Sequence, residues 1–129
     1  MSKKILIIED DRSAARLAQY TLMQAGYDVI LAYDGFEGLS KTINQAPDLV
    51  ILDIMLPGID GYEVCSRLRE RAETATLPVL MISAKAREED KEVGLRVGAN
   101  DYLSKPVEPA VMLEHVAVLI SGSYPVVCK

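Results

Sequence analysis

The run Leu49-Val50-Ile51-Leu52, which ends at Asp53, constrains the fold more than any other stretch. Four consecutive apolar residues of this kind are typical of a strand buried on both faces, as in a parallel sheet. Pro57-Gly58 follows shortly afterwards and marks a loop. Asp53 is therefore expected where a central strand gives way to a loop, at the edge of the sheet where open α/β folds bind their ligands.

Apolar runs and helical patterns alternate along the whole chain. The expected strands are 5–8, 28–32, 49–53, 78–82 and 101–103, and the expected helices are 14–25, 35–46, 62–71, 88–97 and 107–120. This alternation predicts an α/β fold of five βα units, a three-layer sandwich with helices on both faces of a parallel sheet. The flavodoxin-like order 2-1-3-4-5 is expected, because it is the common solution at this length. In the last helix we expect a buried stripe of Val111, Leu113, Val116, Ala117 and Ile120.

Composition limits the classes of function. A length of 129 residues indicates one domain, and a net charge of -5 argues against direct binding of nucleic acid. The apolar run at 5–8 is too short for a signal peptide or a membrane span, so a cytoplasmic location away from the membrane is expected. Cys65 and Cys128 are expected to be reduced, since nothing indicates secretion.

Polar residues stand at the ends of the expected strands. They are Glu9, Asp10, Asp53, Ser83 and Lys105. Each alone is more often a helix cap or a solvated residue, but parallel strands would bring all of them to one edge of the sheet. Carboxylates that close repel one another unless a cation lies among them, and hard oxygen ligands suit Mg²⁺. Together these groups indicate phosphoryl transfer, with Asp53 as the nucleophile that becomes an acyl phosphate.

Two other functions would use a similar sheet. A magnesium-dependent phosphatase or phosphotransferase of the haloacid-dehalogenase type needs a second acid two places after the nucleophile, where this chain has Met55. A flavodoxin-like binding module for a flavin needs a phosphate loop after the first strand. Glu9-Asp10-Asp11, which stands there, would repel a phosphate.

Five motifs resemble the CheY-like receiver domain of two-component response regulators. They are Ile5–Asp11, Pro47–Asp53, Met55–Gly61, Pro78–Ala84 and Gly98–Pro106. The resemblance implies a receiver domain at 1–121 and a C-terminal tail at 122–129. It also implies a phosphorylation-dependent switch that takes its phosphoryl group from a sensor histidine kinase, a phosphotransfer protein or a small phosphodonor. Such a domain catalyses its own phosphorylation and dephosphorylation and is not a turnover enzyme.

The resemblance also implies roles for the acids and the lysine. Asp53 would be the phosphoacceptor. Glu9, Asp10 and Asp53 would hold Mg²⁺, or Mn²⁺, together with the backbone carbonyl of Met55. Lys105 would contact a phosphoryl oxygen. All of these pocket residues are present, so a receiver that has lost phosphorylation and only docks is not favoured.

Further implied roles concern the response to phosphorylation. The hydroxyl of Ser83 would donate to the phosphoryl group, and Tyr102 would turn inward when Ser83 moves. Met55 and Lys85 would tune dephosphorylation, and the apolar Met55 cannot orient an attacking water, so slow hydrolysis is expected. The Lys105-Pro106 bond is expected to be cis.

The output face in this family comprises the fourth helix, the fifth strand and the fifth helix. This face would act on a downstream protein or an effector domain, or would form a homodimer. Lys91 and Asp101 fit the charged network of such dimers. Val111 and His115 stand where relatives usually carry an acid and an arginine.

Overall fold

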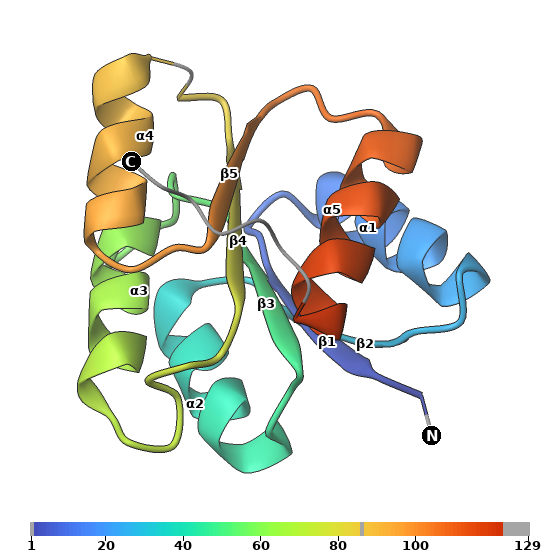
Figure 1. Ribbon diagram of the computed structural model, residues 1–129, viewed down its shortest axis with the longest axis horizontal. Helices are drawn as coiled ribbons and strands as arrows, with labels where there is room; N and C mark the ends of the chain where they lie inside the picture. The colour runs from blue at the N-terminus through green and yellow to red at the C-terminus, as the bar shows by residue number, and fades with distance from the viewer. Residues whose placement is uncertain (1, 86, 123–129) are drawn as a thin grey trace.

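Five parallel strands form one sheet in the order β2-β1-β3-β4-β5 (Figure 1). The strands are β1 (Lys4–Ile8), β2 (Asp28–Ala32), β3 (Leu49–Leu52), β4 (Val79–Ser83) and β5 (Asp101–Ser104). This computed structural model describes residues 2–85 and 87–122. The predicted order is confirmed, and it makes β1 and β3 neighbours at the centre of the sheet.

Helices cover both faces of the sheet. In Figure 1, α1 (Arg12–Gln24) and α5 (Pro109–Ser121) lie on one side, and α2 (Gly35–Gln45), α3 (Gly61–Glu70) and α4 (Glu88–Arg96) on the other. Alternate residues of β1 therefore belong to two separate cores, with Leu6 and Ile8 in one and Ile5 and Ile7 in the other. This two-sided burial explains why the central strands are wholly apolar.

Aspartates cap the first three helices. Asp11 accepts hydrogen bonds from the backbone N–H groups of Ser13 (3.0 Å) and Ala14 (3.3 Å) and so starts α1 at Arg12, two residues before the predicted start. Asp34 and Asp60 cap α2 and α3 in the same way. Each cap satisfies a backbone donor that would otherwise lack a partner at the helix end.

The buried face of α5 differs from the prediction. Its buried residues are Met112, Val116 and Leu119, whereas Val111 and Ala117 are exposed. Leu113 and Ile120 are only partly buried. Because α5 is apolar almost all round, its periodicity could not select the face that packs on the sheet.

The remaining expectations concern the cysteines, the membrane and the tail. Cys65 is a free thiol buried in the core, and burial raises the pKa of that thiol. Cys128 and the rest of 123–129 lie outside the described residues, so the domain boundary at 121 stays a prediction. Within 2–85 and 87–122, the helices are too short or too polar to cross a membrane.

Candidate functional site: an acid pocket at the strand ends

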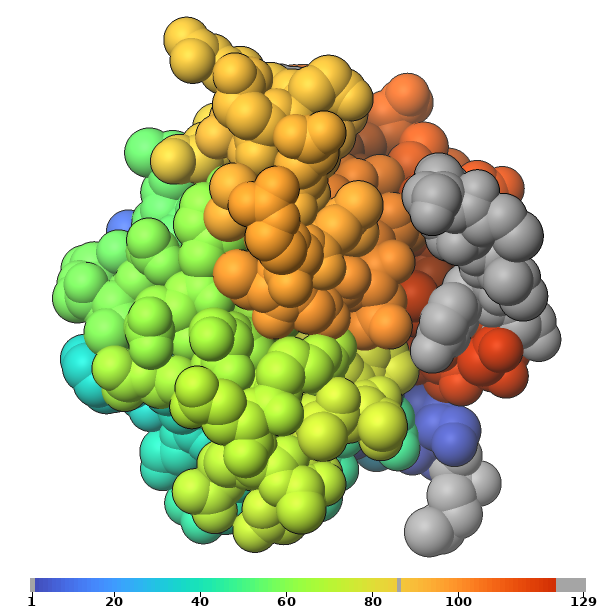
Figure 2. All heavy atoms as spheres, turned by 60° about the vertical axis from the view of Figure 1, so that its left-hand side comes forward, coloured from blue at the N-terminus to red at the C-terminus, as the bar shows by residue number. Residues whose placement is uncertain are grey.

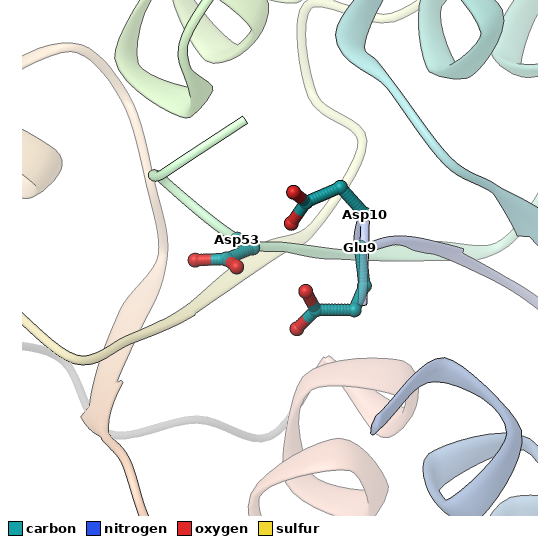
Figure 3. A group of neighbouring side chains, drawn as sticks. All are labelled: Glu9, Asp10 and Asp53. Carbon is teal, nitrogen blue, oxygen red and sulfur yellow. The ribbon is translucent and has the colours of Figure 1, made fainter. Parts of the chain in front are cut away.

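Three carboxylates meet where β1 and β3 end. Glu9 and Asp10 follow β1, Asp53 follows β3, and Figure 3 shows the side chains of Glu9 and Asp10 extending toward Asp53. One carboxylate oxygen from each residue lies within 4.8 Å of the others. Glu9 and Asp53 are only 7% and 6% exposed, and Asp10 is exposed. The structure therefore brings together the three acids that the strand pattern singled out.

Lys105 joins two of these acids. Its Nζ lies 2.7 Å from Oε1 of Glu9 and 3.3 Å from Oδ2 of Asp53. The backbone N–H of Lys105 donates to the carbonyl of Ser83, which ties the end of β5 to the end of β4. The Lys105-Pro106 bond is cis, as predicted. The ammonium group thus compensates charge between two nearly buried carboxylates.

The pKa shifts reflect this crowding. Burial raises the pKa of Glu9, although hydrogen bonds from Lys105 and from the N–H of Asp11 oppose the rise. Burial also disfavours the charge on Lys105, but its hydrogen bond to Glu9 and the charge of Asp53 outweigh burial and raise its pKa. Since three carboxylates face one ammonium, the pocket favours a further cation.

A divalent metal ion fits this donor set. Carboxylate oxygens are the ligands that Mg²⁺ prefers, and it binds through one or two of them while keeping several waters. The exposed Asp10 offers an accessible oxygen beside the buried pair. The backbone N–H of Met55 donates to Oδ1 of Asp53 (3.2 Å), which holds residue 55 close to the acids. A bound ion would neutralise charge on an incoming phosphoryl group.

Ser83 and Tyr102 both contact the backbone of Lys85. The Ser83 hydroxyl, buried at the end of β4, accepts a hydrogen bond from the N–H of Lys85 (3.3 Å). The Tyr102 hydroxyl donates to the carbonyl of Lys85 (2.7 Å), and the Tyr102 side chain is buried. The ring therefore already lies inward while Ser83 binds Lys85, whereas we expected it to turn inward only when Ser83 moves. Lys85 therefore connects the predicted phosphoryl-binding hydroxyl to the predicted aromatic switch.

The two predicted tuning residues lie at the rim of the pocket. Asp10, Met55 and Lys85 line one hollow of about 430 Å³. The Lys85 Nζ lies 5.8 Å from the ring centroid of Tyr62. Of Glu9, Asp10 and Asp53, only Asp10 lines this hollow, beside the thioether and the ammonium group. The roles assigned to Met55 and Lys85 stay predictions.

Tyr62 joins the surroundings of the site, although no sequence pattern predicts a role for it there. Its hydroxyl donates to the carbonyl of Asp90 in the first turn of α4 (3.0 Å). In the sequence, Tyr62 is one of several apolar residues at helical spacing. The one signal of its place near the strand ends is that it follows Gly61, at the start of α3. The bond from Tyr62 to Asp90 joins residues 28 apart in the sequence, so local periodicity cannot predict it.

Asp101, which fits the charged network of family dimers, binds His115, which departs from the family pattern. His115 Nδ1 lies 2.5 Å from Oδ2 of Asp101, which joins α5 to β5 within one chain. Val111 is exposed on the same helix. The Asp101 carboxylate is thus already engaged before any second copy arrives.

The chain is similar to known signalling proteins along most of its length. The family model of the response regulator receiver domain matches residues 5–117. The alkaline phosphatase synthesis transcriptional regulatory protein PhoP of Bacillus subtilis is 46% identical over 123 residues, which cover 95% of this chain and 50% of PhoP. The DNA-binding dual master transcriptional regulator RpaA of Synechocystis is 45% identical over 117 residues, 91% of this chain and 48% of RpaA.

Solved structures agree with these relatives. A CheY-like response regulator receiver domain protein from Methanospirillum hungatei superposes with a TM-score of 0.89 at 29% identity, covering 95% of this chain and 97% of that one. The chain spans about half the length of the two curated relatives. Sequence motifs, strand order and relatives lead to one assignment: the chain belongs to the response regulator receiver domains of two-component signalling.

Proposed function

We propose that this domain is a phosphorylation-dependent switch in which Asp53 takes up a phosphoryl group with the help of Mg²⁺. The observation that carries the proposal is the contact of one ammonium group, Lys105, with both Glu9 and Asp53 beside the exposed Asp10. This arrangement keeps a nearly buried carboxylate beside a fixed positive charge and leaves acid oxygens for a metal. Both features suit transfer of a charged phosphoryl group.

The chemistry follows from the atoms around Asp53. The donor is a phosphohistidine of a sensor histidine kinase or phosphotransfer protein, or a small phosphodonor. A carboxylate oxygen of Asp53 attacks phosphorus, and the bond from phosphorus to the donor atom breaks. That atom is a ring nitrogen of phosphohistidine or an oxygen of a small phosphodonor, and it leaves with the electron pair. Lys105 then pairs with a phosphoryl oxygen instead of with the free carboxylate. Metal, where bound, is held by the three acids and the carbonyl of Met55.

The phosphoryl group also attracts the nearest hydroxyl. Ser83 leaves the N–H of Lys85 and donates to a phosphoryl oxygen, and Tyr102, whose hydroxyl donates to the carbonyl of Lys85, is held in its buried position. The output passes to α4, β5 and α5, which contact a downstream protein, an effector domain or a second copy of the chain. PhoP and RpaA are transcriptional regulators about twice as long as the matched region, which supports an effector domain as partner.

The first experiment measures phosphoryl uptake. Wild-type protein with Mg²⁺ and a small phosphodonor such as acetyl phosphate should gain the mass of one phosphoryl group, and chelation of the metal should prevent the gain. Asp53→Asn should abolish it. Asp28→Asn, which changes an exposed aspartate at the opposite end of a strand, is the control and should behave like wild type. Equal labelling of Asp53→Asn and wild type would refute the proposal.

A second experiment concerns the lifetime of the acyl phosphate. Met55 is 56% exposed and apolar, so it gives no hydrogen bond to an attacking water. Met55→Asn should speed loss of the phosphoryl group, because an amide can orient water. Met23→Asn is the matched control, since Met23 is 54% exposed on α1. An unchanged decay rate in Met55→Asn would remove the tuning role and leave the acceptor role intact.

A further inference from the structure

The helix α4 is held by few buried side chains. Gly94 is its only buried residue, and Leu95 is exposed. A Cβ added at Gly94 would lie 2.9 Å from both the sulfur of Met81 and a ring carbon of Tyr102. The helix therefore rests with its backbone directly on the ring of Tyr102, and apolar burial contributes little else to its position.

Two tyrosine hydroxyls supply hydrogen bonds at the start of α4. Tyr102, from β5, donates to the carbonyl of Lys85 before the helix. Tyr62, from α3, donates to the carbonyl of Asp90 in its first turn. Figure 2 shows that α3 and α4 lie side by side on one face of the molecule, which allows Tyr62 of α3 to reach Asp90 of α4. The beginning of α4 is thus bound from α3, which precedes β4 in the chain, and from β5, which follows α4.

The two phenols belong to one cluster. Burial raises the pKa of Tyr102, and the neighbouring phenol of Tyr62 adds to the rise. Burial and the carboxylate of Asp90 raise the pKa of Tyr62. Lys85 completes the cluster, because its side chain approaches the ring of Tyr62 while its backbone binds Ser83 and Tyr102.

We propose that Tyr62 is a second tyrosine of the switch, a positioning residue whose hydroxyl holds the first turn of α4 against the buried Tyr102. The inference rests on the proposed function, since it concerns how phosphorylation of Asp53 reaches α4. When Ser83 turns to the phosphoryl group and Tyr102 is held inward, the bond from Tyr62 to Asp90 keeps the first turn of α4 in register with it. Tyr62 therefore favours the state in which Tyr102 is buried.

The test compares Tyr62→Phe with Tyr27→Phe in the full chain, with and without Mg²⁺ and beryllium fluoride as the phosphoryl mimic. Tyr27 is likewise partly buried, but it packs against the other core. Loss of one hydrogen bond between uncharged groups should speed amide exchange in 88–96 about fivefold in Tyr62→Phe without the mimic. Exchange in β1 and β3 should stay unchanged, and Tyr27→Phe should leave α4 as in wild type.

A spectroscopic signature separates positioning from bulk stability. In protein labelled with fluorotyrosine, the ¹⁹F resonance of Tyr102 is identified by its loss in Tyr102→Phe. In Tyr62→Phe this resonance should move toward the value of an exposed tyrosine, and beryllium fluoride should move it back. A Tyr102 resonance that stays in place, or an exchange rate that rises equally in α4 and in β1, would overturn the inference.

The two proposals fail in distinguishable ways. Failure of Asp53 to take up a phosphoryl group would refute the switch whatever Tyr62 does. Uptake at Asp53 with wild-type behaviour of α4 and Tyr102 in Tyr62→Phe would refute only the role of Tyr62.

Discussion

The acid pocket and the output face are built with different degrees of packing. At the pocket, every residue of β3 is buried, and β1 is buried except at its first residue. At the output face, β5 has one buried residue, Tyr102, and α4 has one, Gly94. The candidate site thus lies at the ends of strands that are almost wholly buried, and the response is expected from β5 and α4, which bury one residue each.

The difference has a physical reason. Carboxylates that bind a metal and attack phosphorus must be held within fractions of an ångström, and strands buried on both faces provide that. A signalling element needs two states separated by only a few kcal/mol, and a helix with little buried surface meets that condition. Four predictions, from the largest expected effect to the smallest, test this contrast.

The largest effect is expected for Gly61→Ala. A Cβ at this position would lie 2.4 Å from the backbone oxygen of Asp53 and 2.7 Å from Cα of Ile54. Both atoms belong to the backbone after β3 and cannot rotate away, so we expect a loss of about 3 kcal/mol in the free energy of unfolding. Urea denaturation measures it. A loss below about 1 kcal/mol in the free energy of unfolding would contradict the prediction, because it would mean that the backbone at Asp53 and Ile54 can shift to accept the Cβ.

A smaller loss is expected for Arg69→Met, which removes a link between α3 and the turn after α4. The guanidinium donates to the carbonyls of Gly98 and Thr74 and to the side chain of Asn100. Without the guanidinium these acceptors lose their donor, so the free energy of unfolding should fall by about 2 kcal/mol. Arg67→Met is the control and should cost only a few tenths of a kcal/mol, because its pair with Glu63 is exposed. Equal losses in both variants would contradict the prediction.

Gly94→Ala should change stability by less than about 1 kcal/mol, because the gain in helix propensity offsets contact with flexible side chains. Its Cβ meets the sulfur of Met81 and the ring of Tyr102 rather than backbone. The expected response is local: faster amide exchange in α4 and a displaced Tyr102. A loss as large as that of Gly61→Ala would abolish the contrast between the two regions.

The smallest effect is expected for Glu9→Gln and depends on pH. Burial raises the pKa of Glu9 above its ordinary value of 4.5, so its charged form destabilises the fold at neutral pH. The neutral amide should therefore stabilise the metal-free protein slightly at pH 7, and this gain should vanish below pH 4.5, where Glu9 is protonated in both states. Urea denaturation with a chelator tests this. Added Mg²⁺ should then stabilise wild type more than the variant.

Much of the fold was readable from the sequence because it depends on local patterns. The alternation of strand and helix patterns, with short connections, predicts three features of the fold: apolar strands that end at acids, the start of α2 at Gly35, and the order of the strands. The gathering of Glu9, Asp10 and Asp53 also follows, since the ends of adjacent parallel strands must meet. The face of α5 did not follow, because Val111 and Met112 are equally apolar and only contact with the sheet distinguishes them.

By itself, the sequence determined which residues end the strands, and hence which acids and which lysine share one edge of the sheet. Only the tertiary structure decided that Lys105 pairs with Glu9 as well as Asp53, that Asp101 pairs with His115, and that Tyr62 binds α4. The reason is distance along the chain. Strand periodicity depends on neighbouring residues, whereas these contacts join residues 14 to 96 apart in the sequence and form only when whole elements pack together.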